Sequence, residues 1–147
     1  MSSITIEQYF GGRRERYGTE CSPGIETNAA RSVPLFNQLI SEAERFGHTF
    51  QSVGEGDFKD TIINSGWRPP SINSCTPGAS ATSLHMSGEA IDLHDPDNSL
   101  DGWLMTPEGQ YTLTTIGLWM EHPDDTPGWT HVQIKPPASG NRVFKAK

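Results

Sequence analysis

A histidine and an aspartate stand close together in residues 83–93, whose sequence is SLHMSGEAIDL. The histidine is His85, and Asp92 lies in a short apolar segment that follows a glycine. An imidazole nitrogen and a carboxylate oxygen are ligands that divalent metals accept, and zinc is the metal that best suits the pair. The alternative is an ordinary hydrogen bond for each side chain, which is how most buried histidines are satisfied.

A second histidine, His131, lies in a similar apolar context, WTHVQI. Together with His85 and Asp92 it would supply three protein ligands, and a fourth position left to water is the arrangement of catalytic zinc sites. Such ligation predicts metal–ligand distances of about 2.0–2.2 Å and a second hydrogen-bond partner for each imidazole. His94 competes as a ligand because it follows Asp92 on the same strand face. Pro96 interrupts that strand, so we expect a supporting or surface role for His94.

Several further acidic residues surround the motif. We expect four of them to be solvated loop carboxylates: Glu89, Asp95, Asp97 and Asp101. A calcium site would be the alternative, but the segment lacks the ligand spacing of an EF-hand.

The elements that must position these residues can be predicted from periodicity. One helix is expected over residues 27–46, where apolar side chains recur at helical spacing and Gly47 follows. Pro34 lies inside this pattern, so we expect a kink there or a restart at Ser32. A second helix is expected over residues 106–116. Short strands are predicted at residues 61–65, 90–93, 118–121 and 129–134, the last two forming a hairpin.

The remaining segments are predicted to be irregular. Residues 1–24 resemble an arm whose basic cluster, from Arg13 to Arg16, is expected to be solvated; the alternative is contact with an acidic partner. Loops are expected over residues 48–60 and 71–83. The predicted organisation is an arm at 1–26, a single domain at 27–135 and a tail at 136–147.

Composition narrows the class of protein. The chain has 147 residues, which is the size of one domain, and only 33% of them are hydrophobic. A net charge of −7 argues against a nucleic-acid binder. We expect no membrane span and no signal peptide, and therefore synthesis in a bacterial cytoplasm. For Cys21 and Cys75 we expect free thiols, with a disulfide as the alternative.

Three segments resemble a known family. Residues 83–92 resemble the Ser-x-His-x-x-Gly-x-Ala-x-Asp signature of the zinc D-Ala-D-Ala carboxypeptidases. That family shares a fold with the Hedgehog signalling domain and includes bacteriophage peptidoglycan endopeptidases. Residues 65–69, SGWRP, look like its Ser-Gly-Tyr/Trp-Arg segment, and residues 129–132, WTHV, look like its final Trp-x-His strand. The motifs occur in the family's order and span roughly residues 27–135.

The resemblance implies a fold and a set of roles. It implies an α+β domain with a small antiparallel sheet flanked by helices, and a site on one sheet face. It implies that His85, Asp92 and His131 bind Zn²⁺ and that Arg68 reaches a substrate carbonyl or carboxylate.

The general base is where the chain departs from most bacterial members. Their carboxylate lies three residues before the last histidine, and this chain has Gly128 there. In the Hedgehog relatives a glutamate ends the preceding strand of the hairpin, and Glu121 occupies that place here. We therefore predict Glu121 as the base, with Asp125 as the second candidate and the less constrained Asp124 behind it.

The function implied is a zinc peptidase that cleaves the stem peptides of bacterial peptidoglycan, in phage lysis, in a virion or in wall remodelling. Its place of action would be the cell wall or a phage particle, with other virion proteins as further partners. Two alternatives remain: a virion structural protein with a degenerate peptidase fold, and a zinc-containing module that binds the wall without cutting it.

Overall fold

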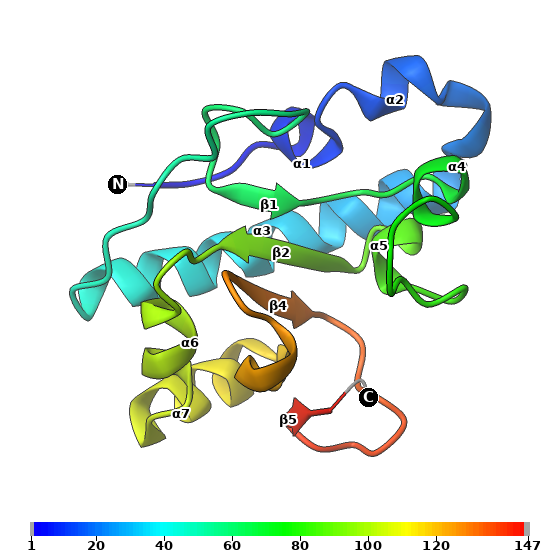
Figure 1. Ribbon diagram of the computed structural model, residues 1–147. Helices are drawn as coiled ribbons and strands as arrows, with labels where there is room; N and C mark the ends of the chain where they lie inside the picture. The colour runs from blue at the N-terminus through cyan, green and yellow to red at the C-terminus, as the bar shows by residue number, and fades with distance from the viewer. Residues whose placement is uncertain (1, 146–147) are drawn as a thin grey trace.

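Five short strands form one sheet in the order β1-β2-β4-β3-β5. The structure is a computed structural model that describes residues 2–145 (Figure 1). Neighbouring strands are antiparallel except for β3 and β5, which are parallel. The α+β class and the predicted hairpin of β3 and β4 are therefore confirmed. The strands are β1 Ile63–Ser65, β2 Ala90–His94, β3 Trp119–Glu121, β4 Trp129–Gln133 and β5 Val143–Phe144.

One long helix, α3 (Pro23–Arg45), lies behind the sheet in Figure 1. It begins earlier than predicted, because the Ser22 side chain accepts a hydrogen bond from the backbone N–H of Ile25 and caps it. The helix continues through Pro34, so there is no restart at Ser32. The second predicted helix is α7 (Pro107–Ile116), capped by Thr106 as its sequence indicated. Short helical segments after α3 are α4 Pro70–Asn73, α5 Leu84–Ser87, α6 Ser99–Leu104 and η2 Pro123–Asp125.

The two faces of the sheet differ because side chains alternate along each strand. Ile91 and Leu93 of β2 and Val132 of β4 are fully buried and share one core with Phe36 and Ile40 of α3. The intervening residues of β2 and β4 point to the opposite face, where the predicted metal ligands lie. Among residues 2–145, no helix is both long enough and apolar enough to cross a membrane.

The prediction of an irregular arm over residues 1–24 is wrong. The segment forms three short helical elements, and the first of them carries two buried aromatic side chains, Tyr9 and Phe10. The Tyr9 hydroxyl donates to the Ala90 carbonyl over 2.8 Å, which ties the segment to β2. The core therefore includes residues from this segment, whose elements are α1 Ile6–Phe10, α2 Arg13–Arg16 and η1 Gly18–Glu20.

The basic cluster is only partly solvated: Arg16 is exposed as expected, whereas the Arg13 side chain is largely buried. Arg13 donates to the Trp67 carbonyl over 2.8 Å and forms an ion pair with Asp57 at 3.1 Å. Arg16 joins the same carboxylate at 2.8 Å, and Arg14 pairs with Glu26 at 2.8 Å. Most of the cluster's charge is thus matched within the chain. Away from this cluster, Cys21 and Cys75 are both free thiols.

Candidate metal centre

Three side chains predicted as metal ligands converge on the sheet face opposite the core. His85 Nε2 lies 3.2 Å from Asp92 Oδ1, and His131 Nδ1 lies 2.9 Å from the same oxygen. One potential ligand atom from each residue lies within 4.8 Å of the others, and all three residues are at least nine-tenths buried. This group could hold a metal ion.

His85 is positioned by α5, a single turn of helix between two fixed ends. The Ser83 side chain accepts a hydrogen bond from the His85 backbone N–H at the start of the turn. Gly88 ends it with a φ of 81°, in the left-handed region that favours glycine. A Cβ on Gly88 would lie 2.9 Å from the Ile25 carbonyl oxygen of α3, so the motif's glycine also allows this close approach. The Ser32 hydroxyl then donates to the Gly88 carbonyl over 2.8 Å.

The ring of His85 is oriented by a backbone carbonyl. Its Nδ1 lies 3.0 Å from the oxygen of Gly66. A carbonyl oxygen can only accept, so Nδ1 must carry the proton and Nε2 presents a lone pair toward Asp92. Gly66 has no room for a side chain, because a Cβ there would overlap the carbonyl oxygen of Tyr9. The N-terminal helix α1 therefore helps to place this carbonyl.

The ring of His131 is oriented by a side-chain amide. Gln133 Nε2 donates to the Lys135 carbonyl over 2.8 Å, which turns the amide oxygen toward the ring. That oxygen lies 2.8 Å from His131 Nε2 and must accept its proton. His131 Nδ1 is then left with a lone pair facing Asp92. Alternation along the strand predicted at residues 129–134 places Gln133 on the same face as His131, but residue type and spacing give Gln133 no role.

With both imidazoles neutral, three acceptor atoms therefore meet with no donor between them. Two imidazole lone pairs and a carboxylate oxygen at these distances require a cation, either a metal ion or a proton. Burial alone would raise the pKa of Asp92, but with a proton in that place the charge of His85 and the hydrogen bond with His131 outweigh the effect of burial and hold that pKa below its usual range. Burial lowers the pKa of His131, and the hydrogen bond with Asp92 raises it to a net value above the usual one.

Arg68 lies beside this group. Its backbone N–H donates to the His85 carbonyl over 3.0 Å, which joins the segment after β1 to α5. Its guanidinium donates to Asn73 over 3.1 Å and reaches the Ser65 hydroxyl at 3.5 Å. Ser65 is the cross-strand partner of Asp92, so Arg68 approaches the site from the β1 edge. Its remaining N–H donors make it a suitable group for a carboxylate or carbonyl oxygen.

Glu121 lies on the other side of His131. The pairing of Trp119 with Gln133 and of Met120 with Val132, continued by one residue, brings Glu121 opposite His131 on the same face. The charge of Glu121 contributes to the raised pKa of His131, as expected for a near neighbour. We use the name site row for five residues, one from each strand: Ser65, Asp92, His131, Glu121 and Phe144.

The turn before β4 explains why position 128 carries no carboxylate. Gly128 has a φ of 93°, and its backbone N–H and C=O are bound to Asn98 Oδ1 and the Asp95 N–H, each at 3.1 Å. Asp125, the second candidate base, lies in η2 with its carboxylate 4.0 Å from the Lys145 ammonium. Glu121 is the predicted candidate that shares the face of the ligands.

Two acidic residues predicted to be solvated are buried instead, and that prediction is wrong. Asp95 and Asp101 are each 1% exposed. Asp95 accepts hydrogen bonds from the Leu100 and Asp101 backbone N–H groups at 3.0 Å and from the Thr130 hydroxyl at 3.1 Å. These donors belong to α6, which the sequence pattern did not reveal, and to the core face of β4. His94 is not a member of the group that could hold a metal ion, and its Nδ1 is buried with no hydrogen-bond partner in residues 2–145.

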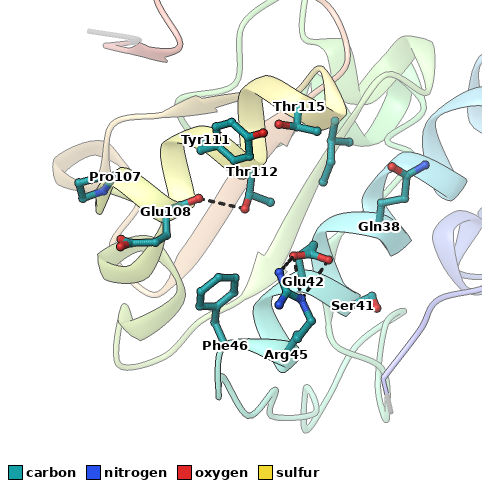
Figure 2. A pocket seen from close by; sticks show the side chains of 11 residues that line it. Gln38, Ser41, Glu42, Arg45, Phe46, Pro107, Glu108, Tyr111, Thr112 and Thr115 are labelled. Atoms are coloured by element: carbon teal, nitrogen blue, oxygen red, sulfur yellow. Dashed lines mark hydrogen bonds and ion pairs between the residues drawn. The ribbon is translucent and has the colours of Figure 1, made fainter.

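A large cavity lies elsewhere, between α3 and α7 (Figure 2). It measures about 710 Å³ and is bordered by Phe46, Tyr111 and the ion pair of Glu42 with Arg45. None of the predicted ligands, nor Arg68 or Glu121, lines it. The candidate metal ligands thus lie on the sheet face and not in this cavity.

Comparison of the chain with protein-family models, with curated proteins and with solved structures finds no match in any of the three.

Proposed function

We propose that the group of His85, Asp92 and His131 binds Zn²⁺ and that the protein is a zinc-dependent peptidase acting on peptidoglycan. The observation that carries the proposal is that Asp92 Oδ1 lies 3.2 Å from His85 Nε2 and 2.9 Å from His131 Nδ1, while the other nitrogen of each ring faces a hydrogen-bond acceptor. Ligands about 2.0–2.1 Å from a tetrahedral zinc lie roughly 3.3 Å apart. The two observed N···O distances, 3.2 and 2.9 Å, are close to that spacing.

Bound zinc would supply Lewis-acid polarisation of a carbonyl and a more acidic water. Glu121 accepts the proton of the attacking water on its carboxylate and passes it to the leaving amine nitrogen. Arg68 donates hydrogen bonds from its guanidinium to the developing oxyanion or to a substrate carboxylate. Gln133 and the Gly66 carbonyl hold the two imidazoles in the tautomers that ligation needs.

The substrate assignment rests on the resemblance of three segments to the zinc D-Ala-D-Ala carboxypeptidase and Hedgehog-type fold family. It names the stem peptide of peptidoglycan as the substrate. The α+β sheet with all three ligands on one face is compatible with that family's architecture. A phage lysis or virion-associated enzyme would meet this substrate at the cell wall.

A non-catalytic role is the second candidate, because Gly128 replaces the carboxylate that most bacterial members carry. The protein would then be a zinc-containing wall-binding module or a virion component. In that case it retains zinc and binds wall peptides without turnover.

The test combines zinc content with digestion of purified cell walls. We expect one zinc per chain, removal of activity by a chelator and its return on adding zinc. His85→Ala should lose both zinc and cutting, whereas Glu121→Gln should keep zinc and lose about 100-fold or more in rate.

The matched control is Glu108→Gln, which changes a carboxylate bordering the α3–α7 cavity and should alter neither property. Failure of the wild type to bind zinc would contradict the proposal as a whole. Zinc binding with no cutting by the wild type would favour the wall-binding candidate.

A further inference from the structure

The C-terminal segment, predicted to be a tail, forms the edge strand β5 beside β3. The Met120 N–H donates to the Arg142 carbonyl over 3.0 Å, and the His122 N–H donates to the Phe144 carbonyl over 2.7 Å. The Arg142 guanidinium donates to the Leu118 carbonyl over 2.8 Å and lies 4.4 Å from the centre of the Trp119 ring. These contacts hold the strand in one position along β3.

That position brings the Phe144 ring to the metal-binding group. Phe144 is the cross-strand partner of Glu121, which is the proposed base. Its ring centroid lies 6.0 Å from that of His131, and the rings are nearly perpendicular at 88°. Such an edge-to-face arrangement is a favourable one for aromatic rings. Phe144 is half-buried, so part of the ring is covered by the protein and part is accessible to a ligand.

The composition of the site row makes Phe144 distinct. The row is polar from Ser65 through Glu121 and ends in one apolar ring. A peptide lying across this face would meet charged and metal-binding groups at its reacting carbonyl and an apolar surface next to it. Small-molecule and peptide sites commonly pair a few polar groups with an apolar wall that selects the neighbouring side chain.

We infer that Phe144 is a specificity-determining residue, whose ring forms the apolar wall against which a small side chain, such as the methyl group of alanine, packs beside the scissile bond. This inference rests on the proposed function. It makes β5 part of the substrate site.

The experiment uses the full chain loaded with zinc, a synthetic stem peptide that contains both L-Ala-D-Glu and D-Ala-D-Ala bonds, and versions in which each Ala is replaced in turn by Leu. For Phe144→Ala we expect kcat/KM on the parent peptide to fall roughly ten-fold. The ratio of kcat/KM for the Leu peptide over the Ala peptide should rise roughly ten-fold, because the shortened side chain opens the wall. For Phe144→Leu, both kcat/KM and the Leu-to-Ala ratio should lie between the values of Phe144→Ala and of the wild type.

Two further measurements separate this role from a structural one. Zinc affinity of Phe144→Ala should stay within about two-fold of the wild type, since the ring is not a ligand. In the inactive Glu121→Gln background, the added Phe144→Ala change should weaken binding of the parent peptide, measured by calorimetry, roughly ten-fold. Phe46→Ala, which removes an exposed ring on the helical side, is the matched control and should change none of these values.

The outcomes are distinguishable. If the wild type neither cuts nor binds the stem peptide, the proposed function fails and this inference fails with it. If the wild type cuts and Phe144→Ala has an unchanged Leu-to-Ala ratio, only the inference is overturned. If Phe144→Ala loses zinc, the ring is a positioning residue for His131, and the specificity role is again overturned.

Discussion

Two buried carboxylates, Asp92 and Asp101, lie near each other in the chain, yet their environments shift their pKa values in opposite directions. Asp92 faces two imidazoles on the open face of the sheet, and their influence keeps its pKa below the usual range. Asp101 lies on the helix-covered side near Asp95, and burial raises its pKa to about 6. Burial favours the neutral form of both, so the difference comes from the partners.

The separation of the two carboxylate sites follows from strand alternation. Thr130 and His131 are neighbours on β4, so their side chains point to opposite faces. His131 meets Asp92, and Thr130 donates to Asp95 over 3.1 Å. Asp92 thus faces the nitrogens of two imidazoles and suits a cation, whereas Asp95 accepts from N–H and O–H donors and stabilises the start of α6.

The largest expected effect concerns Asp92. Asp92→Asn keeps the size of the side chain but removes its charge and places N–H donors among the ligands. We expect zinc affinity, measured by competition with a chromogenic chelator, to fall by more than about 100-fold. Asp101→Asn makes the same chemical change on the other face and should leave the affinity within about two-fold. Equal losses of zinc affinity in the two variants would show that the two carboxylates do not differ in their effect on metal binding.

Asp95 is expected to matter for stability instead. Asp95→Ala leaves two backbone N–H groups of α6 and the Thr130 hydroxyl without their acceptor in a buried place. We expect the free energy of unfolding, measured with urea on the zinc-free protein, to fall by about 3 kcal/mol. Asp97→Ala is the control, because its carboxylate is exposed and accepts from the Ser99 N–H outside the core, and should cost about 1 kcal/mol or less. A small loss for Asp95→Ala would show that these hydrogen bonds contribute little.

The pH dependence of the free energy of unfolding should show the effect of the raised pKa of Asp101. Its folded pKa of about 6 lies above the ordinary value of 3.8, so the fold favours its protonated form. The contribution of this group is complete below about pH 4 and is lost as pH rises through 6. Between pH 4 and pH 7, we expect the free energy of unfolding of the wild type to fall by about 2 kcal/mol more than that of Asp101→Asn. Urea titrations of both proteins across this range measure the difference, and a change of the opposite sign would refute the assignment.

The smallest expected effect is that of Gln133. Gln133→Leu removes the acceptor that holds the proton on His131 Nε2, so Nδ1 is no longer the preferred lone-pair atom. We expect zinc affinity to fall about ten-fold, measured by the same competition. The control is Gln110→Leu in α7, which removes an amide that donates to the Leu104 carbonyl away from the site. An unchanged affinity in Gln133→Leu would show that the tautomer is held by other means.

Local patterns in the sequence were enough to predict several elements and the ligand group. The apolar alternation of residues 129–134 predicts β4 and the shared face of His131 and Gln133, because a strand repeats every two residues. The caps of α7 were likewise visible in Thr106 and Pro107. His85, Asp92 and His131 could be grouped because two short motifs carry them, and the structure brings these three residues together.

Other features depend on long-range contacts that no local pattern encodes. Residues 1–24 lack a long periodic segment, and their short helices are ordered by contacts such as that of Tyr9 with Ala90. Asp95 and Asp101 have the composition of a loop, and only the packing of α6 against β4 buries them. The place of Phe144 depends on a two-residue strand, whose partners are supplied entirely by β3.

The sequence by itself therefore determined which side chains could bind a metal and, for Asp92 and His131, on which strand face they lie, since both follow from residue type and from spacing along one element. Only the tertiary structure decided the charge environment of each carboxylate, the tautomers of the two histidines and the presence of an aromatic ring beside them. These properties depend on which atoms meet across the sheet, and that is determined by strand register and by the packing of α1, α3 and α6 around it.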